Sequence, residues 1–299
     1  MNNHLRLAIV SLSLSTSIGV ALTLALSVGS TKVGAIPTFT ACAIISYALN
    51  YIVFVPSYLA RTEHYFDLTG SITTISLIVF AIASQGNPDA RSIMVALMVL
   101  VWALRLGSFL FLRAKETGGD SRFDKIKQYP VSFLSWWSLQ ALWVLVNIAC
   151  ALAVLTTKEN EPFDIFAVIG AILWVSGFAI EVIADQQKKK YRREAKNKGK
   201  FINTGLWAWS RHPNYFGEIL LWVGITIVAL PVLAGWRWVA LISPIFVVVL
   251  LTKISGIPIL ERRANLQWGN DEHYKVYVKN TPMLLPRPPK TKLERKSGN

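Results

Sequence analysis

Eight apolar blocks, each about as long as a membrane-spanning helix, constrain the fold of this 299-residue chain more than any other feature. Crossing a bilayer takes roughly 20 apolar residues in a helix, and the third and seventh blocks are the shortest. The blocks predict an all-α fold, namely a polytopic integral membrane bundle of about 8 transmembrane helices. They cover residues 8–30, 37–60, 68–84, 92–112, 133–156, 163–184, 215–233 and 238–258.

The composition agrees with a membrane protein. Hydrophobic residues make up 53% of the chain and charged residues 16%, and the mean hydropathy is +0.42. Those values exclude a disordered chain and disfavour an ordinary soluble enzyme. Cys42 and Cys150 lie inside apolar blocks, so no disulfide framework is indicated. The four histidines form no Cys/His cluster, so we expect no metal site.

The net charge of +14 is distributed unevenly. If both termini are cytoplasmic, the inner connections hold nearly all the Lys and Arg, with nine at 185–211 and nine from residue 259 onward. This asymmetry predicts a multi-pass protein with both termini in the cytoplasm. No basic fold lies outside the spans, so nucleic-acid binding is not expected. The outer connections carry one basic residue each, which are Lys32, Arg91, Lys158 and Arg237.

The first block also fits a cleavable signal peptide, because Arg6 precedes its apolar run and small residues follow it. Its run of more than 20 residues favours a retained span instead. No internal repeat is visible. Polar stretches at 60–67, 113–128, 185–216 and in the tail would all face the cytoplasm, as a cofactor site reached from that side requires.

Residues 204–218 run directly into an apolar block and carry cationic, phenolic and carboxylate groups. Asn214 and Glu218 have a structural explanation, as a helix cap and an acid in the first helical turn. That explanation does not cover Arg211 and His212, which beside a helix N-terminus are suited to bind phosphate. We take six residues as candidate cofactor contacts: Arg211, His212, Asn214, Tyr215, Glu218 and Trp222.

The inner end of the sixth block is also rich in charge. Glu181, Asp185 and Lys188 are spaced i, i+4 and i+7, so they share one helical face. For Lys188, Lys189 and the basic residues after them, the alternative is a helix end that reaches towards anionic lipid. Two acids at the inner end of a span do not fit that alternative and indicate inward-facing groups.

The tail repeats the combination of basic and aromatic residues. Glu261, Arg262 and Arg263 follow the last block, and the spacing does not decide which arginine faces a site. Tyr274 and Tyr277 share a helical face at i, i+3. They are either cofactor contacts or an aromatic anchor at the membrane interface.

The motif that runs from Gly205 through Arg211 to Trp222 resembles the C-terminal signature of the steroid 5-alpha-reductase-like membrane proteins. The nearest branch is the group catalogued as domain of unknown function 1295. Sterol C14-type reductases and isoprenylcysteine carboxyl methyltransferases are more distantly similar. The resemblance extends over roughly residues 60–290, and an earlier part of it is carried by Trp102, Arg105, Arg113, Asp120 and Arg122.

The resemblance implies a helical bundle that binds NADPH in a cavity open to the cytoplasm. It divides the chain into N-terminal transmembrane helices (1–60), a catalytic membrane domain (61–290) and a basic tail (291–299). The cofactor contacts that we expect from the residues and the resemblance together are Arg105, Arg113, Asp120, Arg122, Glu181, Asp185, Lys188, Lys189, Arg192, Arg211, His212, Asn214, Tyr215, Glu218, Trp222, Arg262, Tyr274 and Tyr277.

The chain departs from the family pattern at the substrate site. The animal 5-alpha-reductases polarise the substrate ketone with a Gln-Glu pair in an early span, and this chain has no such pair. The nearest acids are Glu63 and Asp67, which we take as candidate catalytic residues. To donate a hydrogen bond to a substrate oxygen, either acid must be protonated, as a buried apolar setting favours.

The leading hypothesis is a membrane-embedded, NADPH-dependent reductase of a C=C bond conjugated to a carbonyl, in a steroid-like or other lipophilic substrate. The alternative is an S-adenosylmethionine-dependent methyltransferase, because those relatives share the Arg-His-Pro-x-Tyr-x-Gly signature seen at 211–217. The third candidate is a non-enzymatic lipid-binding protein, a scaffold or a transporter. The expected partners are a lipophilic small molecule and membrane lipids, without a metal. The sequence does not set the oligomeric state.

Overall fold

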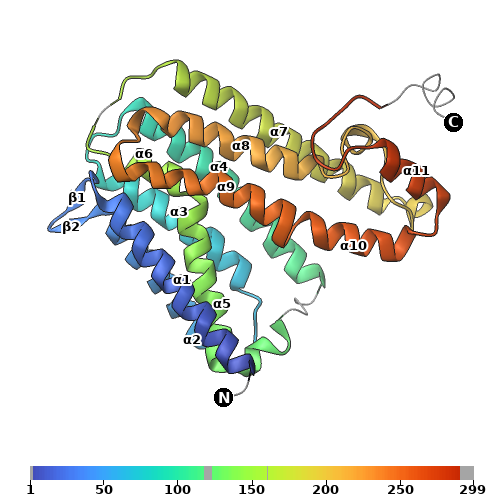
Figure 1. Ribbon diagram of the computed structural model, residues 1–299, viewed down its shortest axis with the longest axis horizontal. Coiled ribbons are helices and arrows are strands. Elements are labelled where there is room, and N and C mark those ends of the chain that lie inside the picture. The colour runs from blue at the N-terminus through green and yellow to red at the C-terminus, as the bar shows by residue number, and fades with distance from the viewer. Residues whose placement is uncertain (1–2, 118–122, 160, 290–299) are drawn as a thin grey trace. The chain divides into compact units, whose positions relative to one another are not determined.

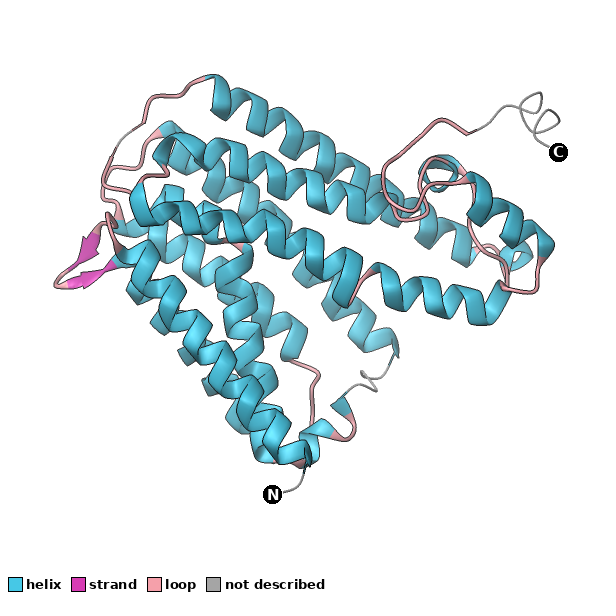
Figure 2. Cartoon of the chain, in the orientation of Figure 1, coloured by secondary structure: helices cyan, strands magenta, loops and turns pink. Residues whose placement is uncertain are grey.

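The computed structural model of the protein describes the backbone of residues 3–117, 123–159 and 161–289, and their side chains except at 3–4 and 111–117. Within this part of the chain nearly all regular structure is helical (Figure 2). The exception is a short antiparallel hairpin of β1 (Lys32–Val33) and β2 (Ile36–Pro37). The predicted all-α fold is therefore confirmed.

Seven helical segments of the described chain are long and apolar enough to cross a membrane. An eighth is counted if α5 (Pro130–Asn147) and α6 (Ala149–Leu155), which meet at a 58° bend, form one span. Each segment overlaps one of the predicted blocks, as a multi-pass membrane protein requires. The seven are Leu5–Ser27, Thr38–Leu59, Phe66–Ala83, Ala90–Leu110, Ile165–Arg193, Pro213–Val232 and Gly235–Trp268.

The chain divides into two compact units. The first unit consists of Met1–Val168 and Ile225–Ser243, and the second of Ile169–Gly224 and Pro244–Asn299. Three helices have residues in both units, namely α7 (Ile165–Arg193), α8 (Pro213–Ala229) and α9 (Ile242–Val249).

The first unit contains most of the early helices, labelled in Figure 1. In it α5 packs against α1 and α2, and α3 packs against α2 and α4. A buried amide also links these helices, because Gln140 donates to Asn50 Oδ1 at 3.2 Å and to the Phe66 carbonyl at 2.7 Å. The elements not yet bounded are α1 (Asn3–Ser27), α2 (Thr38–Leu59), α3 (Phe66–Ser84), α4 (Ala90–Thr117), η2 (Ile126–Gln128), η5 (Leu230–Val232) and η6 (Gly235–Leu241).

Arg91, at the start of α4, is almost fully buried in the first unit, with 1% exposure. Its guanidinium donates to the carbonyls of Val228 and Pro162, at 2.7 Å each. It also pairs with Asp164 at 2.9 Å. One buried cation therefore ties the start of α4 to two other segments of the unit, because Val228 belongs to α8 whereas Pro162 and Asp164 lie together just before α7.

Arg237, in η6, is the second buried arginine of this unit, with 4% exposure. It donates to the Gly29 carbonyl at 2.9 Å and to the Ala153 carbonyl. Its Nη2 also lies 3.4 Å from Thr156 Oγ1. A charge buried this deeply is tolerated when it is hydrogen-bonded, and both terminal nitrogens of Arg237 have partners, which are mostly backbone carbonyls.

The second unit is built on a close approach of α7 and α8, which run side by side in Figure 1. A Cβ on Gly217 would lie 2.5 Å from the Gly177 carbonyl oxygen, and a Cβ on Gly224 would lie 2.6 Å from the Gly170 carbonyl oxygen. Small residues at such points allow helix backbones to meet, as in membrane helix pairs generally. The remaining elements are η3 (Ala195–Asn197), η4 (Gly205–Ala208), η7 (Leu250–Ile254), α10 (Ile257–Trp268) and α11 (Glu272–Asn280).

The last apolar segment is not one regular helix. The stretch η7 is a π-helical turn, closed by a bond from the Ser255 amide to the Leu250 carbonyl at 2.9 Å. At Gly256 a Cβ would lie 2.5 Å from the Leu251 carbonyl oxygen, so the chain needs glycine there. Beyond this break α10 continues as far as Trp268, ten residues past the predicted end of the block at 258.

Candidate functional site

A pocket of about 260 Å³ lies within the second unit. Its walls come from the end of α7, the segment at 200–212, and α10 and α11. The described lining combines five basic side chains with one acid, Glu261. The basic residues are Lys188, Arg192, Lys200, Arg211 and Arg263, and the aromatic and imidazole side chains are Tyr191, Phe201, Trp207, His212, Trp268, Tyr274 and Tyr277.

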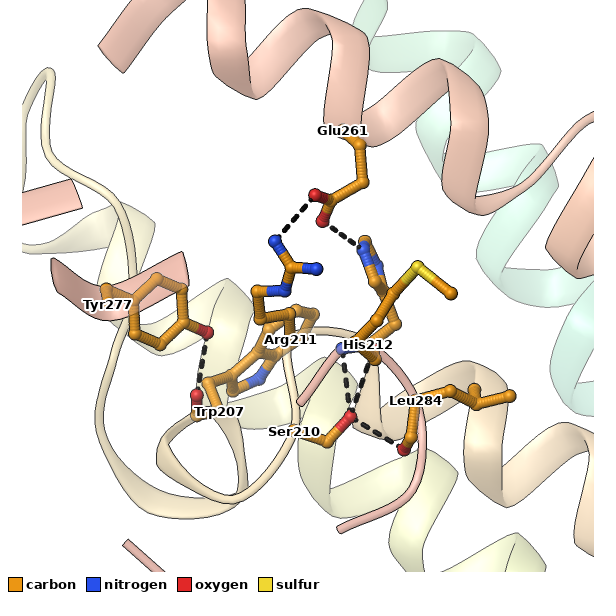
Figure 3. A network of polar contacts seen from close by, with 8 residues as sticks. Trp207, Ser210, Arg211, His212, Glu261, Tyr277 and Leu284 are labelled. Atoms are coloured by element: carbon orange, nitrogen blue, oxygen red, sulfur yellow. Dashed lines mark hydrogen bonds and ion pairs between the residues drawn. The ribbon is translucent and has the colours of Figure 1, made fainter. Parts of the chain in front are cut away.

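Arg211 and His212 converge on the carboxylate of Glu261, which projects from α10 (Figure 3). Arg211 Nη1 donates to Glu261 Oε2 at 2.8 Å. His212 Nε2 lies 2.7 Å from Glu261 Oε1 and acts as the donor, since an ionised carboxylate only accepts. The side chains of Arg211 and His212 are 13% and 7% exposed. The pair of bonds therefore fixes two neighbouring donors at the edge of the pocket.

The turn that carries these residues is held by the C-terminal tail. Ser210 donates to the Leu284 carbonyl at 2.8 Å and accepts from the His212 amide at 3.1 Å, as Figure 3 shows. The Arg211 amide donates to the Pro282 carbonyl at 2.9 Å. The tail that follows α11 is thus a structural part of the site.

The end of α7 holds the other side of the same turn. Trp207 Nε1 donates to the Ala184 carbonyl at 3.0 Å, and the Lys188 ammonium lies 4.5 Å from the centre of the Trp207 ring. Tyr277 of α11 donates to the Trp207 carbonyl at 2.7 Å (Figure 3). Tyrosine is protonated at neutral pH, and burial raises the pKa of Tyr277 further, so its hydroxyl is a donor there. Trp207 is therefore fixed from two helices.

Aromatic side chains form a cluster on the pocket wall. The Phe201 ring lies 5.2 Å from that of Tyr274, 5.3 Å from that of Tyr277 and 5.9 Å from that of Trp268, measured between ring centres. Tyr191 donates to the Phe201 carbonyl at 2.9 Å, which ties the cluster to α7. Together with the basic residues, these rings give the pocket apolar flat faces beside concentrated positive charge.

The glycine contact between α7 and α8 places the predicted residue Glu181 of α7 beside the start of α8, where other predicted cofactor contacts lie. A Cβ on Gly217 would lie 2.7 Å from the Glu181 backbone nitrogen, so the start of α8 runs against buried Glu181. Asn214 is the second residue of α8, not its cap, and its Oδ1 is buried and accepts no hydrogen bond within the described chain. Tyr215 stacks on His212, with ring centres 5.8 Å apart.

The predicted cofactor contacts of the second unit fall into two sets. Six line the pocket: Lys188, Arg192, Arg211, His212, Tyr274 and Tyr277. The others lie nearby in sequence but outside its described lining: Glu181, Asp185, Lys189, Asn214, Tyr215, Glu218, Trp222 and Arg262. Lys189 instead borders a separate surface hollow with Lys190 and Arg193.

The remaining predicted residues belong to the first unit. Buried Glu63 accepts from Lys127 at 2.9 Å, and this hydrogen bond raises the pKa of Lys127. Asp67 is in the first turn of α3 and is half-buried, as is Arg105 in α4. Asp120, Arg122 and the side chain of Arg113 lie outside the described residues.

Of the two arginines left open after the last block, Arg263 lines the pocket and Arg262 does not. Several other lining residues were not predicted. Glu261 stands beside Arg262 in the sequence, so the charge cluster after the last block was the available signal. Phe201, Trp207 and Trp268 gave only the general signal of aromatic residues near basic ones. Among the described residues no group of His, Cys, Asp and Glu is arranged to hold a metal.

The fold and this polar pocket define the protein as a polytopic helical membrane protein, with a cationic, aromatic-lined pocket in its second unit. The chain belongs to the family described as Protein of unknown function (DUF1295), which matches residues 53–281. No curated protein and no solved structure matches it.

Proposed function

We propose that the protein is a membrane-embedded, NADPH-dependent reductase of a C=C bond conjugated to a carbonyl in a lipophilic substrate. The observation that carries the proposal is the pocket lining, where five basic side chains and an aromatic cluster surround one space. NADPH, when bound, supplies the hydride. The protein's own residues have to bind, orient and shield the reacting groups.

The charge of the pocket supports a phosphate-rich ligand. Its described lining holds five Lys and Arg against one acid. A phosphomonoester carries about −1.5 to −2 charge at pH 7, and a dinucleotide with a 2′-phosphate adds a diphosphate to it. Arginine binds phosphate through two parallel hydrogen bonds. S-adenosylmethionine carries a sulfonium cation and no phosphate, so the same charges favour the reductase over the methyltransferase.

The pocket fits part of a dinucleotide. Its volume of about 260 Å³ is below the roughly 300–1,000 Å³ of most small-molecule sites, so we assign it the adenosine end with its phosphates. The rings of Phe201, Trp268 and Tyr274 offer flat faces for a base, and stacking on aromatic side chains is worth about 1–3 kcal/mol per base. Asn214 lies outside the described lining of this pocket, and we assign its buried Oδ1, which accepts no hydrogen bond within the described chain, to another part of the dinucleotide.

For the substrate we assign Asp67 as the residue that binds the carbonyl oxygen. The ion pair of Glu63 with Lys127 favours the ionised carboxylate, which cannot donate a hydrogen bond. Asp67 must be neutral when it donates, so Asp67→Asn should retain reduction because the amide is a donor. Asp67→Leu should abolish it. Loss of activity in both variants would mean that Asp67 acts as an anion.

The direct test uses purified protein in detergent. We expect NADPH to raise the melting temperature, NADH to raise it less, and S-adenosylmethionine to leave it unchanged. Arg211→Gln should weaken NADPH binding about 10- to 100-fold, because a charge-assisted hydrogen bond is worth about 1.5–3 kcal/mol. Arg262→Gln is the matched control, since Arg262 is exposed and outside the described pocket lining.

Stabilisation by S-adenosylmethionine instead of NADPH would favour the methyltransferase. The proposal includes a finer relationship to the steroid 5-alpha-reductase-like reductases, and an orientation with both termini and the pocket on the cytoplasmic side. Labelling of Lys200 tests the cytoplasmic position of the pocket. Lys200 lies in the loop after α7 and lines the pocket, so a membrane-impermeant amine reagent added to sealed vesicles of known orientation should reach it only from the cytoplasmic side.

A further inference from the structure

Glu261 occupies the position in the pocket that is best arranged to receive an anion. Its two carboxylate oxygens accept from different residues, Arg211 at 2.8 Å and His212 at 2.7 Å (Figure 3). The arrangement matches the way in which a phosphate would be bound, by one guanidinium and one imidazole donor. Glu261 is also the one acid in the described lining, among five basic residues.

Both residues direct one donor to this carboxylate, Arg211 through Nη1 and His212 through Nε2, while Arg211 Nε is buried and makes no hydrogen bond within the described chain. The side chains of Arg211 and His212 are largely buried, and Glu261 itself is 21% exposed. A phosphate that binds to the same guanidinium or imidazole while Glu261 stays in place brings two negative charges within a few ångströms of each other. At 4 Å such charges repel by about 1 kcal/mol in water and by more in a protein interior. A ligand therefore has to displace Glu261 or bind beside it against repulsion.

We propose that Glu261 is a built-in competitor for the anionic group of the ligand and a specificity residue of the pocket. The inference rests on the proposed NADPH site. By holding Arg211 and His212 when no ligand is bound, the carboxylate lowers the affinity for every anion. Ligands with several phosphates overcome this because the other basic residues bind the additional charges, whereas an ion with a single phosphate does not.

The alternative hypothesis is that Glu261 only positions the two donors. The two hypotheses predict opposite changes in NADPH affinity for the variant Glu261→Gln, which keeps the shape of the side chain and removes its charge. If Glu261 competes, the variant binds NADPH roughly tenfold more tightly. If it only positions Arg211 and His212, the variant binds NADPH more weakly.

The experiment measures binding of NADPH, pyrophosphate and orthophosphate to the purified full-length protein, by calorimetry and by thermal stabilisation. For Glu261→Gln we expect tighter binding of all three, with the largest relative gain for orthophosphate. Glu261→Asp retracts the charge without removing it and should give a smaller gain. Glu272→Gln is the matched control, because Glu272 is an exposed acid of α11 outside the described lining.

Unchanged or weaker anion binding in Glu261→Gln would overturn the inference. If Glu261→Gln fails to fold, the change in anion affinity of Glu261→Asp decides: tighter binding supports the inference, and unchanged or weaker binding overturns it. Failure of the proposed function gives a different result from failure of the inference. In that case the wild-type protein would not bind NADPH, but the comparison of pyrophosphate binding between wild type and Glu261→Gln would still test the role of Glu261. If the site instead takes S-adenosylmethionine, Glu261→Gln should weaken that binding, because the variant removes the negative charge next to a cationic ligand.

Discussion

The two units surround their buried arginines with different partners. In the first unit Arg91 and Arg237 bind mainly backbone carbonyls of distant segments, and both are less than 5% exposed. In the second unit Arg211 binds one carboxylate at the edge of a pocket, and its side chain is 13% exposed. Backbone carbonyls cannot be displaced without unfolding, whereas a carboxylate can give way to a ligand. We therefore expect the kind of partner, rather than burial of the charge alone, to distinguish a binding site from a structural contact.

The largest expected effect is a loss of stability when the buried Arg91 of the first unit is replaced. Arg91→Met should destabilise the protein by about 2–4 kcal/mol, because it removes the donors to the Val228 and Pro162 carbonyls, and an unsatisfied buried acceptor costs about 1–3 kcal/mol. Thermal unfolding in detergent measures the change. Arg193→Met, at an exposed position of α7, serves as the control. A loss as large in Arg211→Met would break the comparison, since we expect that variant to lose ligand binding rather than stability.

A smaller effect is expected where α8 meets α7. Gly217→Ala places a Cβ 2.5 Å from the Gly177 carbonyl oxygen, so the helices have to separate, at a cost of about 1–3 kcal/mol. Because the start of α8 follows Arg211 and His212 directly, NADPH affinity should fall with stability. Ala179→Val, on an exposed face of α7, should change neither quantity. Lost stability with unchanged affinity would show that the pocket does not depend on this contact.

Tyr277→Phe should weaken the second unit by about 1 kcal/mol, because it removes the hydrogen bond to the Trp207 carbonyl and keeps the ring. The aromatic cluster around Phe201 should persist, so NADPH affinity should fall by less than in Arg211→Gln. Tyr65→Phe is the control, since Tyr65 is exposed in the first unit. An affinity loss equal to that of Arg211→Gln would indicate that the Tyr277 hydroxyl contacts the ligand.

The smallest effect separates two neighbouring lysines of α7. Lys188 lines the pocket and lies over Trp207, whereas Lys189 borders a separate hollow. Lys188→Gln should reduce NADPH affinity up to about fivefold, the scale of a partly exposed ion pair. Lys189→Gln should leave the affinity unchanged. Equal losses in a titration of both variants would mean that general positive charge, rather than the pocket, attracts the nucleotide.

The spans were predictable from sequence because the bilayer fixes their length and their apolar composition. The orientation of α10 was harder to predict from the sequence. Whether Arg262 or Arg263 faces the pocket depends on how the helix is rotated after the last apolar block. The π-turn at Leu250–Ile254 and the break at Gly256 change that rotation, and Arg263 lines the pocket. Helical periodicity predicts side-chain directions only for an unbroken helix, so it could not have shown that Arg263 faces the pocket.

Glu261 illustrates a second limit. Its role depends on two hydrogen bonds to residues about 50 positions earlier in the chain. Sequence patterns predicted Arg211 and His212 as phosphate contacts because they precede a helix, but no local rule connects them to an acid in α10. The bend of 58° between α5 and α6 was missed for a similar reason, because the apolar block runs through it without proline or glycine.

The pairing of the tail with the turn at Ser210 has a consequence for biosynthesis. The carbonyls of Pro282 and Leu284 bind the Arg211 amide and the Ser210 hydroxyl, and the Arg287 amide binds the Trp209 carbonyl. The pocket can therefore close only after the ribosome has translated residues 282–287. A nascent chain halted before Pro282 would already contain every apolar segment needed for insertion, yet it would reach the membrane without a finished pocket.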